Sequence, residues 1–145
     1  MFNFFDKNNY SIGNQYFDNE NEKIFNVFEN LYESILQSKA NNIVAGLLDE
    51  LSIYANHHFK DEEQLMEKYS YPWLKITKHE HAQFKETIDK YKLDLADGKL
   101  FISMKLMNFL EKWIYNHILY YDKDFIEHYY PQNSQNKIEL QDINN

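Results

Sequence analysis

The sequence contains no cysteine, only three glycines and two prolines, and no long apolar run among its 145 residues. The absence of cysteine excludes disulfides, thiolate zinc sites, iron–sulfur clusters and a cysteine nucleophile. So few turn residues disfavour a sheet of many strands. No stretch approaches the ~18 consecutive apolar residues of a membrane span, and the opening MFNFFDKNNY lacks the basic segment of an export signal. We therefore expect a cytoplasmic protein without membrane association.

Acidic residues outnumber basic ones, 23 to 15, which gives a formal net charge of −8 at pH 7. Phosphate binding needs a basic surface, so nucleic acid is not an expected partner. The length fits one domain, and a hydrophobic content of 43% supplies one core. The 12 tyrosines and 11 phenylalanines indicate a core rich in rings, in which tyrosine hydroxyls need hydrogen-bond partners.

Four stretches carry apolar residues at the spacing of an amphipathic helix. The first is expected from Asp18 to about Lys39, and the second starts after a cap at Asn41 or Asn42. The third is expected between Pro72, in its first turn, and a C-terminal cap at Gly98, and the fourth ends near His128. Because the links are short, neighbouring helices are antiparallel. We predict an all-α, up-down-up-down antiparallel four-helix bundle.

The two ends of the chain differ in composition from the middle. Residues 1–17 include six aromatic residues, too many for a solvated tail, and are predicted to form an aromatic arm across the bundle. Residues 131–145 read PQNSQNKIELQDINN, a polar composition typical of a frayed tail. The bundle domain is thus expected within residues 1–130. The arm could instead cover a second subunit, so an oligomer is compatible with the sequence.

Polar side chains that bind metals interrupt the apolar faces of three predicted helices. They are His58, Glu62, His81, His117 and Asp122. Burying three imidazoles and two carboxylates is costly unless they pair with one another or bind a cation. Since three helices contribute to one layer, the pattern indicates a metal site, and imidazole with carboxylate and no sulfur suits iron, manganese or zinc.

The spacing within each helix decides whether these side chains can converge. His58 and Glu62 are four residues apart, so both point the same way from adjacent turns. His117 and Asp122 are five apart, ~140° around an α-helix, and converge only if the bundle axis lies between their directions. The remaining histidines, His57, His79 and His128, fall off these faces and are expected at the surface. The Glu-x-x-His pairs of ferritin-like bundles and the zinc motif HExxH do not occur.

Four blocks of the sequence resemble the hemerythrins and bacterial hemerythrin-like domains. HFKDEEQLM at 58–66 resembles the family's HFxxEExxM, and HEHAQF at 79–84 is similar to its EHxxF. WIYNHILYYD at 113–122 resembles WxxNHxxxxD, and FDNENEKIF at 17–25 resembles xDxxHxxLF. The blocks follow the family's order and spacing over roughly residues 10–128.

This resemblance implies a di-iron centre. The family holds two oxo-bridged irons with five histidines, one glutamate and one aspartate; both carboxylates bridge the irons, and one iron keeps an open position for dioxygen. By this resemblance the ligands are His58, Glu62, His81, His117 and Asp122. Two family histidines are replaced, one by Asn21, whose amide oxygen could bind metal, and one by Thr77, a poor ligand. One iron would then keep His81 and His117, and the other only His58.

Three functions follow from this depleted ligand set. The first is a hemerythrin-like di-iron protein that binds or senses dioxygen or another small ligand. The second is a bundle that holds one ion or a different metal, and the third is a metal-free interaction module of the same family. Hemerythrins mostly bind dioxygen without turning it over, so an enzyme is not expected, although reduction of oxygen or peroxide remains open.

Overall fold

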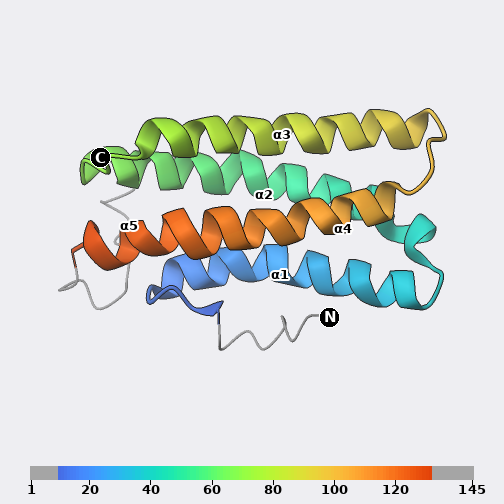
Figure 1. The fold of residues 1–145 in the computed structure, drawn as a ribbon, viewed down its shortest axis with the longest axis horizontal. Helices are drawn as coiled ribbons and strands as arrows, with labels where there is room; N and C mark the ends of the chain where they lie inside the picture. The colour runs from blue at the N-terminus through green and yellow to red at the C-terminus, as the bar shows by residue number, and fades with distance from the viewer. Residues whose placement is uncertain (1–9, 132–145) are drawn as a thin grey trace.

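The computed structural model describes residues 10–131, which form helices and no strand (Figure 1). The first three helices are α1 (Gln15–Leu36), α2 (Ala40–Lys68) and α3 (Leu74–Ala96). The fourth is continuous but changes its winding: α4 (Ile102–Trp113) passes into a π-helix, η2 (Ile114–Asp122), and then into α5 (Lys123–His128). The prediction of an all-α four-helix bundle is confirmed.

The helices run up and down around one axis (Figure 1). α1 packs against α2 and α4, α2 packs against α3, and α3 also contacts α4 and η2. Residues 37–39, 69–73 and 97–101 make the three links. These links are too short to cross the bundle, so consecutive helices lie antiparallel. None of the helices in the described range is long and apolar enough to cross a membrane.

The helix ends differ in detail from the sequence prediction. α1 begins at Gln15 rather than Asp18, because the side-chain oxygen of Asn14 accepts the backbone N–H of Phe17 at 3.1 Å and caps the helix. Asp18 instead accepts the backbone N–H of Ile12 at 2.8 Å, which ties the preceding segment to the helix. α2 begins at Ala40 without a side-chain cap, and α3 begins at Leu74, just after Pro72. Gly98 follows α3 with φ of 75°, as a C-terminal cap requires.

The predicted arm is described only from residue 10 onward, and its residues 1–9 lie outside the described part of the chain. Ile12 is buried in the core, and the ring of Tyr10 lies 5.9 Å from that of Phe25. This end of the arm therefore packs on the bundle. The helical start at residue 15 places the last part of the predicted arm within α1. Most of the predicted polar tail, residues 132–145, also lies outside the described residues.

The core is built largely from aromatic side chains. Five phenylalanines are fully buried along the bundle: Phe17, Phe28, Phe59, Phe84 and Phe125. Each such ring contributes ~1.5–3 kcal/mol relative to an exposed position. This burial offsets the cost of the polar layer in the middle of the same core, which includes Asn21, His58, Glu62 and Asp122.

The π-helix alters the face that the fourth helix presents to the core. In a π-helix the backbone bond runs from residue i to residue i+5, so side chains five apart lie close to one line. His117 and Asp122 have this spacing and are both buried. The ~140° separation expected from α-helical winding is therefore wrong for this segment. π segments are rare in proteins, and a large share of those that occur lie at functional sites.

Candidate metal centre

The carboxylate of Glu62 lies at the middle of a buried cluster of imidazoles. Its Oε1 is 3.2 Å from Nε2 of His81 and 3.3 Å from Nε2 of His117. Its Oε2 is 2.9 Å from Nε2 of His58. Oδ1 of Asp122 lies 3.3 Å from Nε2 of His117. The structure thus brings together all five side chains singled out from the sequence, and none is more than 2% exposed.

Local helix geometry explains this convergence. α2 supplies His58 and Glu62 from successive turns of its buried face, which continues the apolar stripe of Leu51 and Leu65. α3 supplies His81, and η2 supplies His117 and Asp122. Helix packing brings the three faces together, and the π winding turns the last carboxylate inward.

Two sets of potential metal donors share Glu62. Glu62, His81 and His117 form one group, which we call the His81 set, and His58, Glu62 and Asp122 form the other, the His58 set. Within each set one donor atom of each residue lies within 4.8 Å of the others. Glu62 thus directs Oε1 toward the imidazoles of the His81 set and Oε2 toward His58.

The polar atoms of the cluster are poorly satisfied by one another. Both ring nitrogens of His58, Oε2 of Glu62 and both carboxylate oxygens of Asp122 are buried and lack an aligned hydrogen bond. Buried polar atoms without partners are rare and destabilise a fold. A cation at the shared point would serve Nε2 of His58 and the carboxylate oxygens of Glu62 and Asp122. Donors about 3 Å apart suit two ligands that lie ~2.1 Å from one ion at a right angle.

Two further carboxylates accept hydrogen bonds from the Nδ1 atoms of the His81 set, on the side of each ring that faces away from Glu62. Nδ1 of His81 donates to Oε2 of Glu63 at 2.6 Å, and Nδ1 of His117 donates to Oε1 of Glu80 at 2.7 Å. With the ring proton on Nδ1, each Nε2 turns a lone pair toward the centre. The two Nε2 atoms are only 3.1 Å apart. That contact requires a proton or a cation between them, so the residues of the cluster fit a metal.

Glu63 and Glu80 were not identified from the sequence. Each stands next to a singled-out residue, Glu63 after Glu62 and Glu80 before His81, but each reaches an imidazole of the next helix. Only the packing of α2 on α3, and of α3 on η2, creates these pairs. The only feature of the sequence that could have pointed to them is their place directly beside Glu62 and His81.

Two carboxylates buried side by side shift the pKa values of the cluster. Burial, and then the charge of Glu62, raises the pKa of Asp122 well above its usual range. Burial alone would raise the pKa of Glu62, but hydrogen bonds from Asp122 and the imidazoles hold it well below its usual range. Burial opposes charging of His117, but the charge of Asp122 and the neighbouring hydrogen bonds raise its pKa well above the ordinary value. Without a cation, protons therefore hold this cluster together.

Asn21 lies beside the His58 set. It is fully buried, and its Oδ1 accepts a long hydrogen bond of 3.4 Å from the hydroxyl of Tyr54. Its Nδ2 has no partner among the described residues. The ring of Tyr54 stacks on His58 with centroids 4.9 Å apart. Asn21 is thus placed near this end of the centre, with its amide held by Tyr54.

Thr77 lies one turn before His81 on the buried face of α3. Its hydroxyl donates to the backbone oxygen of Leu74 at 2.8 Å and contacts the sulfur of Met66 at 3.4 Å. This hydroxyl is therefore engaged within the core rather than offered to the cluster. The side chains of His57, His79 and His128 are exposed, as the sequence predicted, and replace neither lost imidazole.

Comparison with known proteins agrees with this geometry. Residues 13–129 match the family model of the hemerythrin HHE cation binding domain. The bacteriohemerythrin of Pseudomonas aeruginosa strain UCBPP-PA14 is 27% identical over 81% of this chain and 75% of its own length. That of Stenotrophomonas maltophilia is 30% identical over 74% of this chain and 69% of its own length. That of Clostridium acetobutylicum is 28% identical over 83% and 97%.

The family match spans most of the chain and covers every helix from α1 to α5. It includes all of the side chains that meet at Glu62. The chain belongs to the hemerythrin family and is a hemerythrin-like metal-binding domain.

Proposed function

We propose that this protein holds a carboxylate-bridged di-iron centre at the buried cluster and binds or senses dioxygen there. One observation carries the proposal: two donor sets share the single carboxylate of Glu62, with one oxygen toward each set. Asp122 belongs to the His58 set and also lies 3.3 Å from Nε2 of His117. It is therefore the natural second bridge between two ions.

Each residue of the cluster has a distinct role in this proposal. His81 and His117 would hold one ion and His58 the other, while Glu62 and Asp122 would neutralise the charge of both. Iron held in this way supplies reversible electron transfer to dioxygen. Glu63 and Glu80 keep the protons of their imidazoles on Nδ1, so that each Nε2 stays available to metal.

Aromatic side chains enclose the proposed centre. The ring of Phe59 stacks on His81 with centroids 4.0 Å apart, and Trp113 stacks on His117 at 4.1 Å. Phe17 meets His58 edge to face at 5.8 Å. These rings fix the orientation of the imidazoles and limit the access of water. Fewer water ligands at the iron would favour reversible dioxygen binding over oxidation of the iron.

A centre with a single metal is the second candidate. Both imidazoles of the His81 set are oriented by carboxylates, whereas Nδ1 of His58 has no partner among the described residues. The His81 set is thus the more preorganised of the two. One ion per chain at Glu62, His81 and His117 would follow if the His58 set fails to retain its metal.

Counting metal in protein made without chelator or affinity nickel tests the proposal directly. We expect two irons per chain and a near-ultraviolet absorption of an oxo-bridged pair that changes with oxygen. Glu62→Gln should lose most of the iron, because it removes the charge shared by both sets. Gln64→Glu, an exposed change on the same helix, is the control. One ion per chain would support the second candidate, and none would support a metal-free module.

Restoring the two missing imidazoles should strengthen iron binding. Asn21→His and Thr77→His each place a ring on a buried face beside one donor set. An added ligand should be worth at least the ~10-fold that an outer partner of a ligand contributes. Competition with a chelator measures the affinity, and each single variant should improve one set only. Unchanged iron affinity in the double variant would contradict the geometry proposed here.

Removing either outer carboxylate should weaken the metal it supports. Glu63→Gln and Glu80→Gln leave His81 and His117 without a charged acceptor at Nδ1, and affinity should fall ~10- to 100-fold. Glu67→Gln and Glu86→Gln, exposed positions on the same two helices, are matched controls. Chelator titration checks the result. Equal losses in the controls would mean that net charge, rather than the orientation of the imidazoles, sets the affinity.

The metal-free protein should lose stability as pH rises. The raised pKa values of Asp122 and His117 mean that protons bind the folded form more tightly than the unfolded chain. This stabilisation is complete below the unfolded pKa of each group and is lost as pH rises through the folded pKa. Glu62, with a lowered pKa, acts in the opposite sense, but only at acid pH.

Thermal melts in chelator from pH 6 to pH 8 should therefore show a falling free energy of unfolding, by at least ~1 kcal/mol. Asp122→Asn should flatten this slope. Added metal should reverse it, because metal competes with protons for the same atoms. A metal-free protein whose stability rises over this range would argue against protons holding the empty cluster together.

A further inference from the structure

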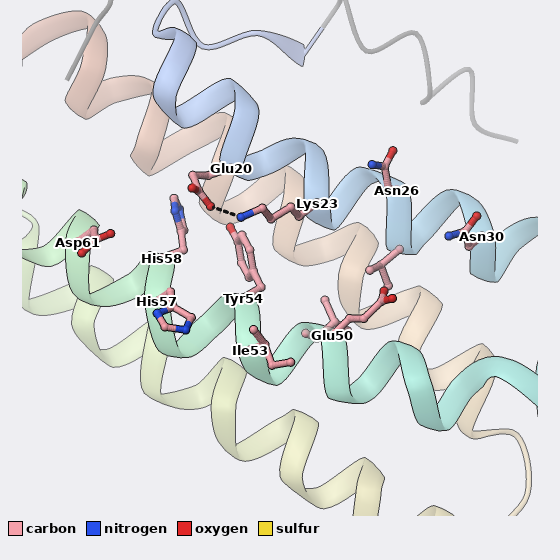
Figure 2. A pocket seen from close by; sticks show the side chains of 12 residues that line it. Glu20, Lys23, Asn26, Asn30, Glu50, Ile53, Tyr54, His57, His58 and Asp61 are labelled. Carbon is pink, nitrogen blue, oxygen red and sulfur yellow. Dashed lines mark hydrogen bonds and ion pairs between the residues drawn. The ribbon is translucent and has the colours of Figure 1, made fainter. Parts of the chain in front are cut away.

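We propose that the cleft between α1 and α2 is the path by which divalent cations reach the His58 set. This inference rests on the proposed metal centre and adds to it a route and a direction of loading. The cleft has a volume of about 500 Å³ and is lined by residues of both helices (Figure 2). At its inner wall lie Tyr54 and His58, so it connects the surface of the bundle to one end of the cluster.

The inner end of the cleft carries a buried group that lacks a partner. His58 is 2% exposed, and neither of its ring nitrogens has an aligned hydrogen bond. Figure 2 shows its ring extending from α2 toward α1, beside Tyr54. Stacking on Tyr54 holds the ring in this position without using its nitrogens. A cation arriving through the cleft therefore meets an imidazole whose only close polar neighbour among the described residues is Glu62, itself a member of the His58 set.

The outer part of the cleft is negatively charged. Glu20, Glu50 and Asp61 contribute carboxylates to its lining, and Lys23 is the one lysine there. The charge of Lys23 is offset by an ion pair of 3.0 Å with Glu20, drawn as a dashed line in Figure 2. This pair leaves the carboxylates of Glu50 and Asp61 as the excess charge of the lining, and an excess of negative charge concentrates cations and speeds their arrival. The overall net charge of −8 acts in the same direction.

Asp61 and His57 offer a first contact for the ion. They are four residues apart on α2 and line the same cleft, each ~100° around the helix from the buried residue that follows it. The hydroxyl of Tyr16 donates to Oδ2 of Asp61 at 3.1 Å, which orients this carboxylate. The step from Asp61 and His57 to His58 and Glu62 crosses from the exposed to the buried side of one helix.

Within the described part of the chain, the cavity on the His117 side of the cluster differs in size and charge. A smaller cavity of about 230 Å³ reaches His117 between α3 and the fourth helix. There Glu80 is already bonded to Nδ1 of His117, and Lys112 adds a positive charge to the lining. This wall presents a satisfied imidazole and balanced charge. Cations are therefore drawn to the α1–α2 side.

Rapid mixing of the metal-free full chain with Co²⁺ alone tests the route, because Co²⁺ reports on its ligands by visible absorption and is not oxidised by air. The variant Glu50→Gln/Asp61→Asn removes two cleft charges. At low salt it should load about tenfold more slowly and depend less on ionic strength, with the same final metal content. The control Glu86→Gln/Asp89→Asn removes two exposed charges from α3, outside the cleft.

Three outcomes separate the possibilities. Slow loading confined to the cleft variant, with the salt-sensitive phase missing in His58→Ala, supports the route. Wild-type rates in the cleft variant, or equal slowing in the control, overturn it while leaving the metal centre intact. If the unaltered chain binds no Co²⁺ at any time, the proposed centre itself fails and the route fails with it.

Discussion

Everything in the proposed centre depends on one buried carboxylate, that of Glu62. It is 1% exposed and lies within 3.3 Å of three imidazoles from three helical segments. An isolated carboxylate at this depth would be strongly destabilising. Its presence therefore constrains every neighbour, because each must supply a proton, a hydrogen bond or a shared cation. The helices around it have to pack so that these groups arrive at the same height in the bundle.

The fourth helix meets this constraint by changing its winding. An α-helix would separate His117 and Asp122 by ~140° and direct one of them away from Glu62. The π segment from Ile114 to Asp122 brings both inward. α4 before it and α5 after it return to ordinary winding, so the distortion is confined to the residues that need it. The π winding is a consequence of the buried site. Burial of the surrounding aromatic side chains offsets the free-energy cost of this irregular winding.

Much of this arrangement could be predicted from the sequence, because the buried face of α2 follows from the spacing of its apolar residues alone. His58 and Glu62 occupy positions in this regular stripe where apolar residues are expected, and the sequence alone reveals this. The meeting of His117 with Asp122 was expected from the resemblance, but the π winding that produces it was not, because an α-helical spacing was assumed and local winding depends on tertiary packing. The outer pairs of Glu63 with His81 and of Glu80 with His117 were also invisible, since each links two helices whose relative rotation only the fold fixes. The cap at Asn14 shows the same limit at a helix end, where several polar residues compete.

The two replaced imidazoles divide the centre into unlike halves. Thr77 turns its hydroxyl to the backbone of α3, but the imidazoles that remain in the His81 set are each fixed by a carboxylate and an aromatic ring. Asn21 keeps a buried amide beside His58, whose Nδ1 has no carboxylate acceptor among the described residues, and an acidic cleft lies alongside. Preorganised ligands retain a metal, because little order remains to be gained on binding. In the proposed centre the His81 half would therefore retain its ion more firmly than the His58 half.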